Sequence, residues 1–149
     1  MRGKIAFLVV LVFACLIVFN PTCSYYISNK NVSVTATGSN IICDAEIVEV
    51  PSNEKSMYGY SEFKVIVKNH DNDGNVTGVN YDYTLTIENN NSSNGLFGYN
   101  NDNFQSSLVL NGSMTTSSTE NNYIIQVKST SGLSESIDYK VSLNCTQSN

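Results

Sequence analysis

Few residues in this chain of 149 could carry out chemistry. Its single histidine, His70, follows an alternating segment, whereas a catalytic triad or an imidazole-based zinc site needs further partners at defined spacing. We interpret His70 as an exposed turn residue and assign no catalytic residue, no metal-binding histidine and no cofactor. The sequence therefore predicts a protein that is not an enzyme.

The oxygen-bearing residues around this histidine begin with the spacing of a calcium loop. Asn69, Asp71 and Asp73 alternate ahead of Gly74, as the first ligands and the glycine of such a loop do. The twelfth position holds Asn80 instead of a bidentate glutamate. A hairpin-type turn, in which Asp73-Gly74 suits positive φ, is the favoured interpretation. The three residues remain a weak calcium candidate.

The cysteines predict a disulfide bond. Cys15 and Cys23 lie in an N-terminal segment that we expect to be removed, which leaves Cys43 and Cys145 as the possible intrachain pair. An exported protein meets oxidising conditions in which such a bond persists. The alternative is a pair of buried free thiols, which are common core residues.

The tyrosines could form a sugar-binding surface, since aromatic faces stack on pyranose rings. The chain has no tryptophan, and Tyr81 and Tyr83 alternate with polar residues in a way that places them in a core. Tyr58 and Tyr60, in a glycine-containing loop, remain as a possible binding loop.

The charge balance excludes one class of partner. Charged residues make up 14% of the chain and the formal net charge is −5. Removal of Arg2 and Lys4 with the N-terminal segment would leave about −7. Nucleic-acid binding requires a positive patch that neutralises phosphates, and the sequence contains no basic cluster. We therefore expect no nucleic-acid partner.

The N-terminus has the features of an export signal. Arg2 and Lys4 precede an apolar run over 5–19, which is shorter than the ~20 residues of a transmembrane helix. Thr22 and Ser24 are small residues at the positions that precede a cleavage site. We interpret Met1–Ser24 as a helical signal peptide, with an uncleaved anchor as the alternative. The protein is expected to be secreted or held at the cell surface, with membrane contact only through this segment.

The remainder, residues 25–149, shows period-two patterns separated by Asn-, Asp-, Gly- and Ser-rich turns. We find no convincing helix there. Half-polar strands without helical crossovers favour a single antiparallel β-sandwich of seven or eight strands, immunoglobulin-like or jelly-roll-like. The expected strands are 31–37, 41–50, 62–68, 80–88, 96–99, 107–110, 122–129 and 136–145.

Three stretches resemble a known family. The aromatic pair in "CSYYIS" after the signal, the long segment "GYSEFKVIVKNHDNDGNVTGVNYDYTLTIENNNSSNGLF" and the C-terminal "YKVSLNCTQ" are similar to the TasA/camelysin group. These are secreted proteins of low-GC Gram-positive bacteria. The resemblance implies a β-sandwich that polymerises into biofilm-matrix fibres by donating an N-terminal strand to its neighbour. We transfer no catalytic residue from this group, because the chain has no constellation to receive one.

The segment 31–37 is compatible with that role. Val32, Val34 and Ala36 alternate along it close to the new N-terminus, where addition of a strand to another sheet is easiest. An ordinary edge strand of its own domain is the alternative. Two functions follow: a structural subunit of a surface fibre or matrix, which associates with itself or with other surface proteins, and a monomeric binding module, an adhesin or carbohydrate-binding domain, that uses Tyr58 and Tyr60.

Overall fold

The computed structural model describes residues 27–55, 60–90, 93–100, 103–130 and 136–148. The expected signal peptide, Met1–Ser24, lies outside these residues. Across the described ranges, no helix is both long enough and apolar enough to span a membrane.

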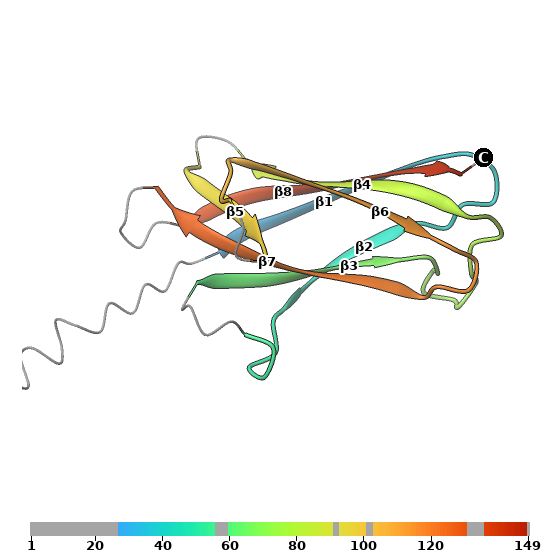
Figure 1. Ribbon diagram of the computed structural model, residues 1–149, viewed down its shortest axis with the longest axis horizontal. Helices are drawn as coiled ribbons and strands as arrows, with labels where there is room; N and C mark the ends of the chain where they lie inside the picture. Colours follow the sequence, from blue (N-terminus) through green and yellow to red (C-terminus); the bar gives the residue numbers. More distant parts are fainter. Residues whose placement is uncertain (1–26, 56–59, 91–92, 101–102, 131–135, 149) are drawn as a thin grey trace, which may run out of the picture.

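Eight strands form two packed four-stranded sheets (Figure 1), and the chain is a β-sandwich. Sheet A has the order β1-β8-β4-β6, and sheet B has the order β2-β3-β7-β5. The strands are β1 (Ile27–Thr37), β2 (Asp44–Glu49), β3 (Ser61–Lys68), β4 (Tyr81–Asn89), β5 (Gly95–Tyr99), β6 (Ser107–Met114), β7 (Glu120–Ser129) and β8 (Ile137–Gln147).

Each strand expected from the alternation is present, with small shifts at its ends. The largest shifts are at the start of β1, which begins at Ile27 instead of residue 31, and at the end of β6, which continues to Met114 instead of residue 110. The strand β2 begins at Asp44 although the apolar pattern starts at Ile41. The intervening residues connect the two sheets, and there the amide N–H of Ile42 donates to the hydroxyl of Thr77 (3.3 Å). In this segment a hydrogen bond to a side chain takes the place of the backbone hydrogen bonds of a strand.

One pair of strands departs from the antiparallel expectation: β1 and β8 are parallel. We expected no parallel pairing because helical crossovers are missing. However, β1 and β8 are the first and last strands, so the six strands between them form the connection. Figure 1 shows that β1 ends on the same side of the sandwich as the C-terminus.

The core contains the inward-facing side chains of both sheets. On β4 these are Tyr81, Tyr83, Leu85 and Ile87, all at most 2% exposed. They alternate with Asp82 and other polar residues on the outer face, as the period of two predicts. Burial raises the pKa of Tyr81 to about 12, so its phenol stays neutral and donates to the carbonyl of Lys68 (3.1 Å).

Tyr139 of β8 lies at the centre of the core. Its ring stacks on Phe63 (centroids 4.3 Å apart) and meets the edge of Phe97 (6.1 Å). Burial raises the pKa of the Tyr139 phenol. None of the described groups lies within hydrogen-bonding distance of its hydroxyl oxygen. The ring therefore contributes packing, while the hydroxyl carries a desolvation cost.

Replacement of Tyr139 by Phe should raise the free energy of unfolding by about 1–2 kcal/mol, because a buried hydroxyl without a partner is removed and the ring stays. Urea unfolding followed by circular dichroism measures the change. The matched variant is Tyr81→Phe, which loses a hydrogen bond and should lower stability by about 1 kcal/mol. Destabilisation by Tyr139→Phe would show that an internal water bonds the hydroxyl.

Candidate functional site

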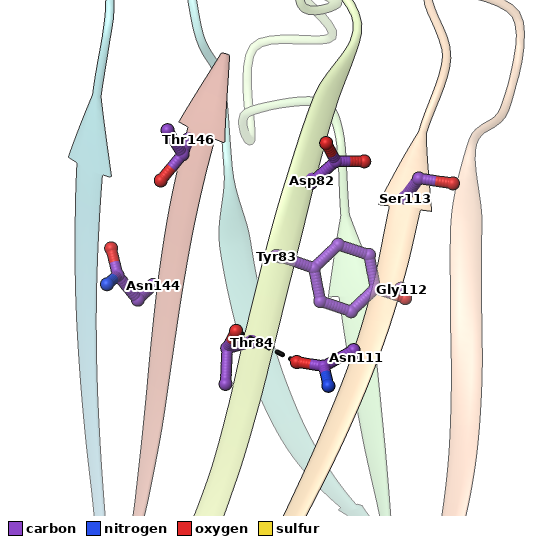
Figure 2. Close-up of a pocket in the computed structure, with 8 residues that line it drawn as sticks. All are labelled: Asp82, Tyr83, Thr84, Asn111, Gly112, Ser113, Asn144 and Thr146. Carbon is purple, nitrogen blue, oxygen red and sulfur yellow. Dashed lines mark hydrogen bonds between the residues drawn. The ribbon is translucent and has the colours of Figure 1, made fainter. Parts of the chain in front are cut away.

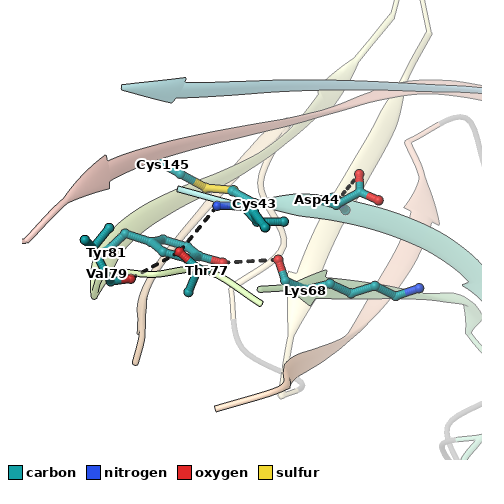
Figure 3. Close-up of a disulfide and its surroundings, with 9 residues drawn as sticks. Cys43, Asp44, Lys68, Thr77, Val79, Tyr81 and Cys145 are labelled. Carbon is teal, nitrogen blue, oxygen red and sulfur yellow. Dashed lines mark hydrogen bonds between the residues drawn. A yellow bond between two sulfur atoms is a disulfide. The ribbon is translucent and has the colours of Figure 1, made fainter. Parts of the chain in front are cut away.

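The predicted disulfide joins Cys43 to Cys145. Figure 3 shows it between the segment that enters β2 and the end of β8, beside Thr77. The Thr77 hydroxyl lies 3.2 Å from the carbonyl oxygens of both Asn40 and Val79. These contacts anchor the chain from Asn40 onward to the body of the sandwich.

The candidate assembly strand, Asn31–Thr37, forms most of β1, at one edge of sheet A. It pairs with β8 of its own domain, which is the alternative considered from sequence. Its inner face continues that of β8: Val32, Val34 and Ala36 are in register with Val141, Leu143 and Cys145. On the outer face, the Ser33 hydroxyl donates to the Ser142 hydroxyl (3.1 Å).

The strand β1 and its neighbour β8 differ in how deeply their side chains are buried. Every residue from Asn31 to Thr37 is exposed, whereas Val141 and Leu143 on β8 are at most 1% exposed. Val32 keeps 41% and Val34 keeps 37% of its surface in contact with solvent, on the face where β8 supplies the core. Thus β1 completes the hydrogen-bond ladder of sheet A but adds little to the hydrophobic core.

A turn with left-handed backbone follows β1. Gly38 has φ of +136° and Asn40 has φ of +61°. A side chain at Gly38 would approach Ile41 and Gln147 to about 3 Å, so this position favours glycine on two grounds. The assembly strand is therefore joined to the anchored segment at Asn40 by two residues only.

The calcium candidates are not brought together as a ligand set. Asn69 is buried, and its amide nitrogen donates to the carbonyl of Thr115 (3.0 Å). One carboxylate oxygen of Asp71 accepts the backbone N–H groups of Asp73 (3.0 Å) and Asn75 (2.9 Å), and the other accepts the Asn75 side chain. These bonds lower the pKa of Asp71, with the Asn75 side chain as the largest cause.

The surrounding loop contains a local turn at Asp73-Gly74, as the sequence favoured, but β3 and β4 on either side of it do not pair as a hairpin. Gly74 has φ of +83°, and a β-bridge joins His70 to Val76. The loop connects β3 in sheet B to β4 in sheet A, so the local turn lies inside a longer link between sheets. In the described part of the chain, no cluster of three or more His, Cys, Asp or Glu residues could hold a metal ion.

Of the two loop tyrosines, Tyr58 lies outside the described residues and Tyr60 is half-buried. The Tyr60 ring meets the edge of Phe104 (centroids 5.2 Å apart). The ammonium of Lys128 lies 3.6 Å from the Phe104 centroid and 4.6 Å from that of Tyr60. Much of the tyrosine face is thus used within the protein. Sequence reasoning missed Phe104, because it is a lone aromatic residue in a polar segment.

A second polar surface lies on the outer face of sheet A. An open pocket there has a volume of about 440 Å³. Figure 2 shows the residues of β4, β6 and β8 that line it. The Thr84 hydroxyl donates to the Asn111 amide oxygen (3.0 Å) across its floor, and the Tyr83 ring lies against Gly112. The outward residues were each expected to meet solvent, but only the strand order shows which of them are neighbours.

No family model, curated protein or solved structure matches this chain. Of the surfaces described above, the calcium candidate has the Asp71 carboxylate and the Asn69 amide nitrogen engaged internally, while the Asn69 side-chain oxygen is buried without a partner among the described residues. The aromatic cluster has its ring faces engaged. The edge strand β1 is the feature whose exposure and attachment require explanation.

Proposed function

We propose that this protein is an extracellular structural subunit of a surface fibre or biofilm matrix, and that it assembles by donating β1 to a second copy. One observation carries the proposal: β1 completes sheet A while Asn31–Thr37 stays exposed along its whole length. An edge strand with little core contact can leave its own domain at a small cost in buried apolar surface.

Exchange of β1 between copies would preserve the same interactions. The donated strand would meet an identical β8 edge, with Val32 beside Val141 and Val34 beside Leu143. The parallel ladder and the Ser33–Ser142 hydrogen bond would form again. The difference in free energy between the two arrangements then depends on the linker and on protein concentration, as in domain swapping.

The attachment of β1 supports the same proposal. The disulfide and Thr77 hold the chain from Asn40 onward, whereas Gly38 and Ser39 lie between that anchor and the strand. Rotation at these residues would redirect β1 and uncover the β8 edge, while the other three strands of sheet A and all of sheet B keep their pairing. The similarity to TasA and camelysin-like proteins, and the export signal expected at Met1–Ser24, agree with assembly outside the cell. Enzymatic activity forms no part of this function.

Strand donation predicts a specific cross-link between copies. Ser33→Cys and Ser142→Cys are prepared as separate variants of the mature chain, Tyr25–Asn149, mixed and oxidised. The two positions are in register with their hydroxyls 3.1 Å apart, so a bond between copies forms only if β1 of one pairs with β8 of another. Non-reducing electrophoresis should show a dimer band that is absent from either variant alone.

The matched control uses two strands that stay within one copy. Thr84 and Asn111 are in register on β4 and β6, with side-chain oxygens 3.0 Å apart. A mixture of Thr84→Cys and Asn111→Cys should therefore remain monomeric. Equal cross-linking in both mixtures would indicate random collision. Absence of the Ser33–Ser142 dimer at every concentration would reject strand donation.

The competing function is a monomeric glycan-binding module. The cluster of Tyr60, Phe104 and Lys128 supplies aromatic and cationic groups for it. Light scattering of the mature chain beside a form that starts at Gly38 separates the two functions. Growth with concentration in the longer form alone supports the fibre subunit. Monomers in both forms, together with saturable glycan binding, support the module.

A further inference from the structure

The four edge strands of the sandwich differ in how they are protected. Unpaired edges associate with other edges unless charges, prolines, bulges or covering segments prevent it. In sheet B both edges are protected. The edge strand β2 carries Asp44, Glu46 and Glu49. The other edge strand, β5, is covered, because Phe97 and Gln105 exchange two backbone hydrogen bonds (2.7 and 3.0 Å).

Sheet A has fewer of these protections. Its edge strand β6 has the sequence SLVLNGSM, without a charge or a proline. Among the described residues, no backbone group outside the sheet bonds to β6 between Ser107 and Gly112; the Asn121 side chain reaches only the carbonyl of Ser113 (3.3 Å). The opposite edge strand, β1, carries one charge, Lys30, and has a register irregularity between Ile27 and Lys30, but its longer part, Asn31–Thr37, is uncharged and regularly paired. Sheet A is therefore open at both edges over Asn31–Thr37 of β1 and Ser107–Gly112 of β6.

The directions of these edges make them complementary. The strand β1 is parallel to β8, β8 is antiparallel to β4, and β4 is antiparallel to β6. Consequently β1 and β6 run in the same direction on opposite sides of sheet A. A second copy displaced sideways in the same orientation would place its β1 parallel to β6 of the first. This contact uses two different surfaces, so it repeats without closing.

The side chains agree with this arrangement. Val32 and Val34 lie on the inner face of β1, and Leu108 and Leu110 lie on the inner face of β6. In a continuous sheet, the half-exposed valines of one copy would lie beside the leucines of the next. The joined edges would cover apolar surface that the isolated protein leaves in water.

We propose that β6 of one copy binds β1 of the next, so that sheet A continues from subunit to subunit. The occupant of the β6 edge is a second copy of this chain. This contact goes beyond strand donation and does not require it, because the outer edge of β1 is open whether β1 pairs with its own β8 or with that of a neighbour.

The test uses a chain in which strand donation is blocked. The double variant Ser33→Cys/Ser142→Cys, oxidised within each monomer, ties β1 to its own β8 and leaves both outer edges unchanged. Sedimentation velocity of this locked chain should show a weight-average mass that rises with concentration. A locked chain that stays monomeric, while the unlocked chain assembles, would overturn edge pairing and retain strand donation.

Lysine substitutions then identify the edges. In the locked chain, Val109→Lys on β6 and Thr35→Lys on β1 should each weaken self-association about tenfold or more, because edge lysines oppose pairing. The matched control is Val76→Lys: Val76 is 50% exposed and Val109 is 53% exposed, but Val76 lies in a loop. It should assemble as the locked parent does, and equal loss in this control would overturn the assignment.

A mixture of the two edge variants gives the most specific result. The Val109→Lys chain keeps an intact β1 edge, and the Thr35→Lys chain keeps an intact β6 edge. Their equimolar mixture should form dimers, and nothing larger, at concentrations at which each variant alone is monomeric. Dimers from Thr35→Lys alone would indicate that two β6 edges pair with each other, and this would overturn the β6–β1 contact.

Discussion

Replacement of Cys43 and Cys145 by Ala is expected to lower the free energy of unfolding by about 4–5 kcal/mol. The bond closes a loop over a sequence separation of 102 residues, and in the chain-entropy model a loop of this length restricts the unfolded chain by that amount. Alanine is the appropriate replacement because Cys145 is fully buried, where a serine hydroxyl would add its own desolvation cost.

Urea unfolding followed by tyrosine fluorescence measures the effect, since the chain has nine tyrosines and no tryptophan. The unmodified mature chain in reductant should approach the stability of the double variant. Adding reductant to the double variant itself should change nothing. A loss below about 1 kcal/mol would show that the unfolded chain is already compact, so that the bond restricts it little.

Gly112→Ala is expected to destabilise the fold by about 3 kcal/mol, the upper part of the range for overpacking. Gly112 is in register with Tyr83, and a Cβ there would lie 2.4 Å from both Cζ and Oη of that tyrosine. The Tyr83 ring cannot move away freely, because its hydroxyl is held by two hydrogen bonds. One joins it to the Tyr123 hydroxyl (2.6 Å), and the other is donated by the Asn121 side-chain amide (2.7 Å).

The control for the glycine prediction is Gly78→Ala. A Cβ at Gly78 would lie 3.4 Å from the Asn40 side chain, which is an ordinary contact. The free energy of unfolding, measured by thermal unfolding, should therefore change by no more than about 0.5 kcal/mol. Tyr83→Leu removes the colliding end of the ring. Combined with Gly112→Ala, it should cost less than the sum of the two single changes. Strict additivity would show that the collision is not the cause.

The strands were predictable because one physical requirement produces both pattern and structure. A strand with one buried face must alternate apolar and polar side chains, and in β4 and β8 the alternation is nearly complete. The pairing of strands was not predictable in this way. The alternation of Val32, Val34 and Ala36 is the same whether β1 has an antiparallel neighbour or the parallel β8.

The same limit applies to the candidate sites. The disulfide could be predicted, since Cys43 and Cys145 remain once the signal segment is set aside and both fall on inward-facing patterns. By contrast, the contacts of Phe104 with Tyr60 and Lys128 depend on where three distant segments meet. The unprotected edges of sheet A became visible only with the strand order, because an uncharged strand such as β6 would be ordinary in the middle of a sheet.

The pairing of the first strand with the last also has a consequence for biosynthesis. During synthesis β1 leaves the ribosome first, and its partner β8 emerges only after the six other strands. Non-local contacts of this kind form late, so β1 remains without its partner β8 until the rest of the chain has been synthesised. The Cys43–Cys145 bond must wait for the same strand. We therefore expect chains that emerge close together to exchange β1 more often than isolated chains do, because each β1 is available before its own β8 is present.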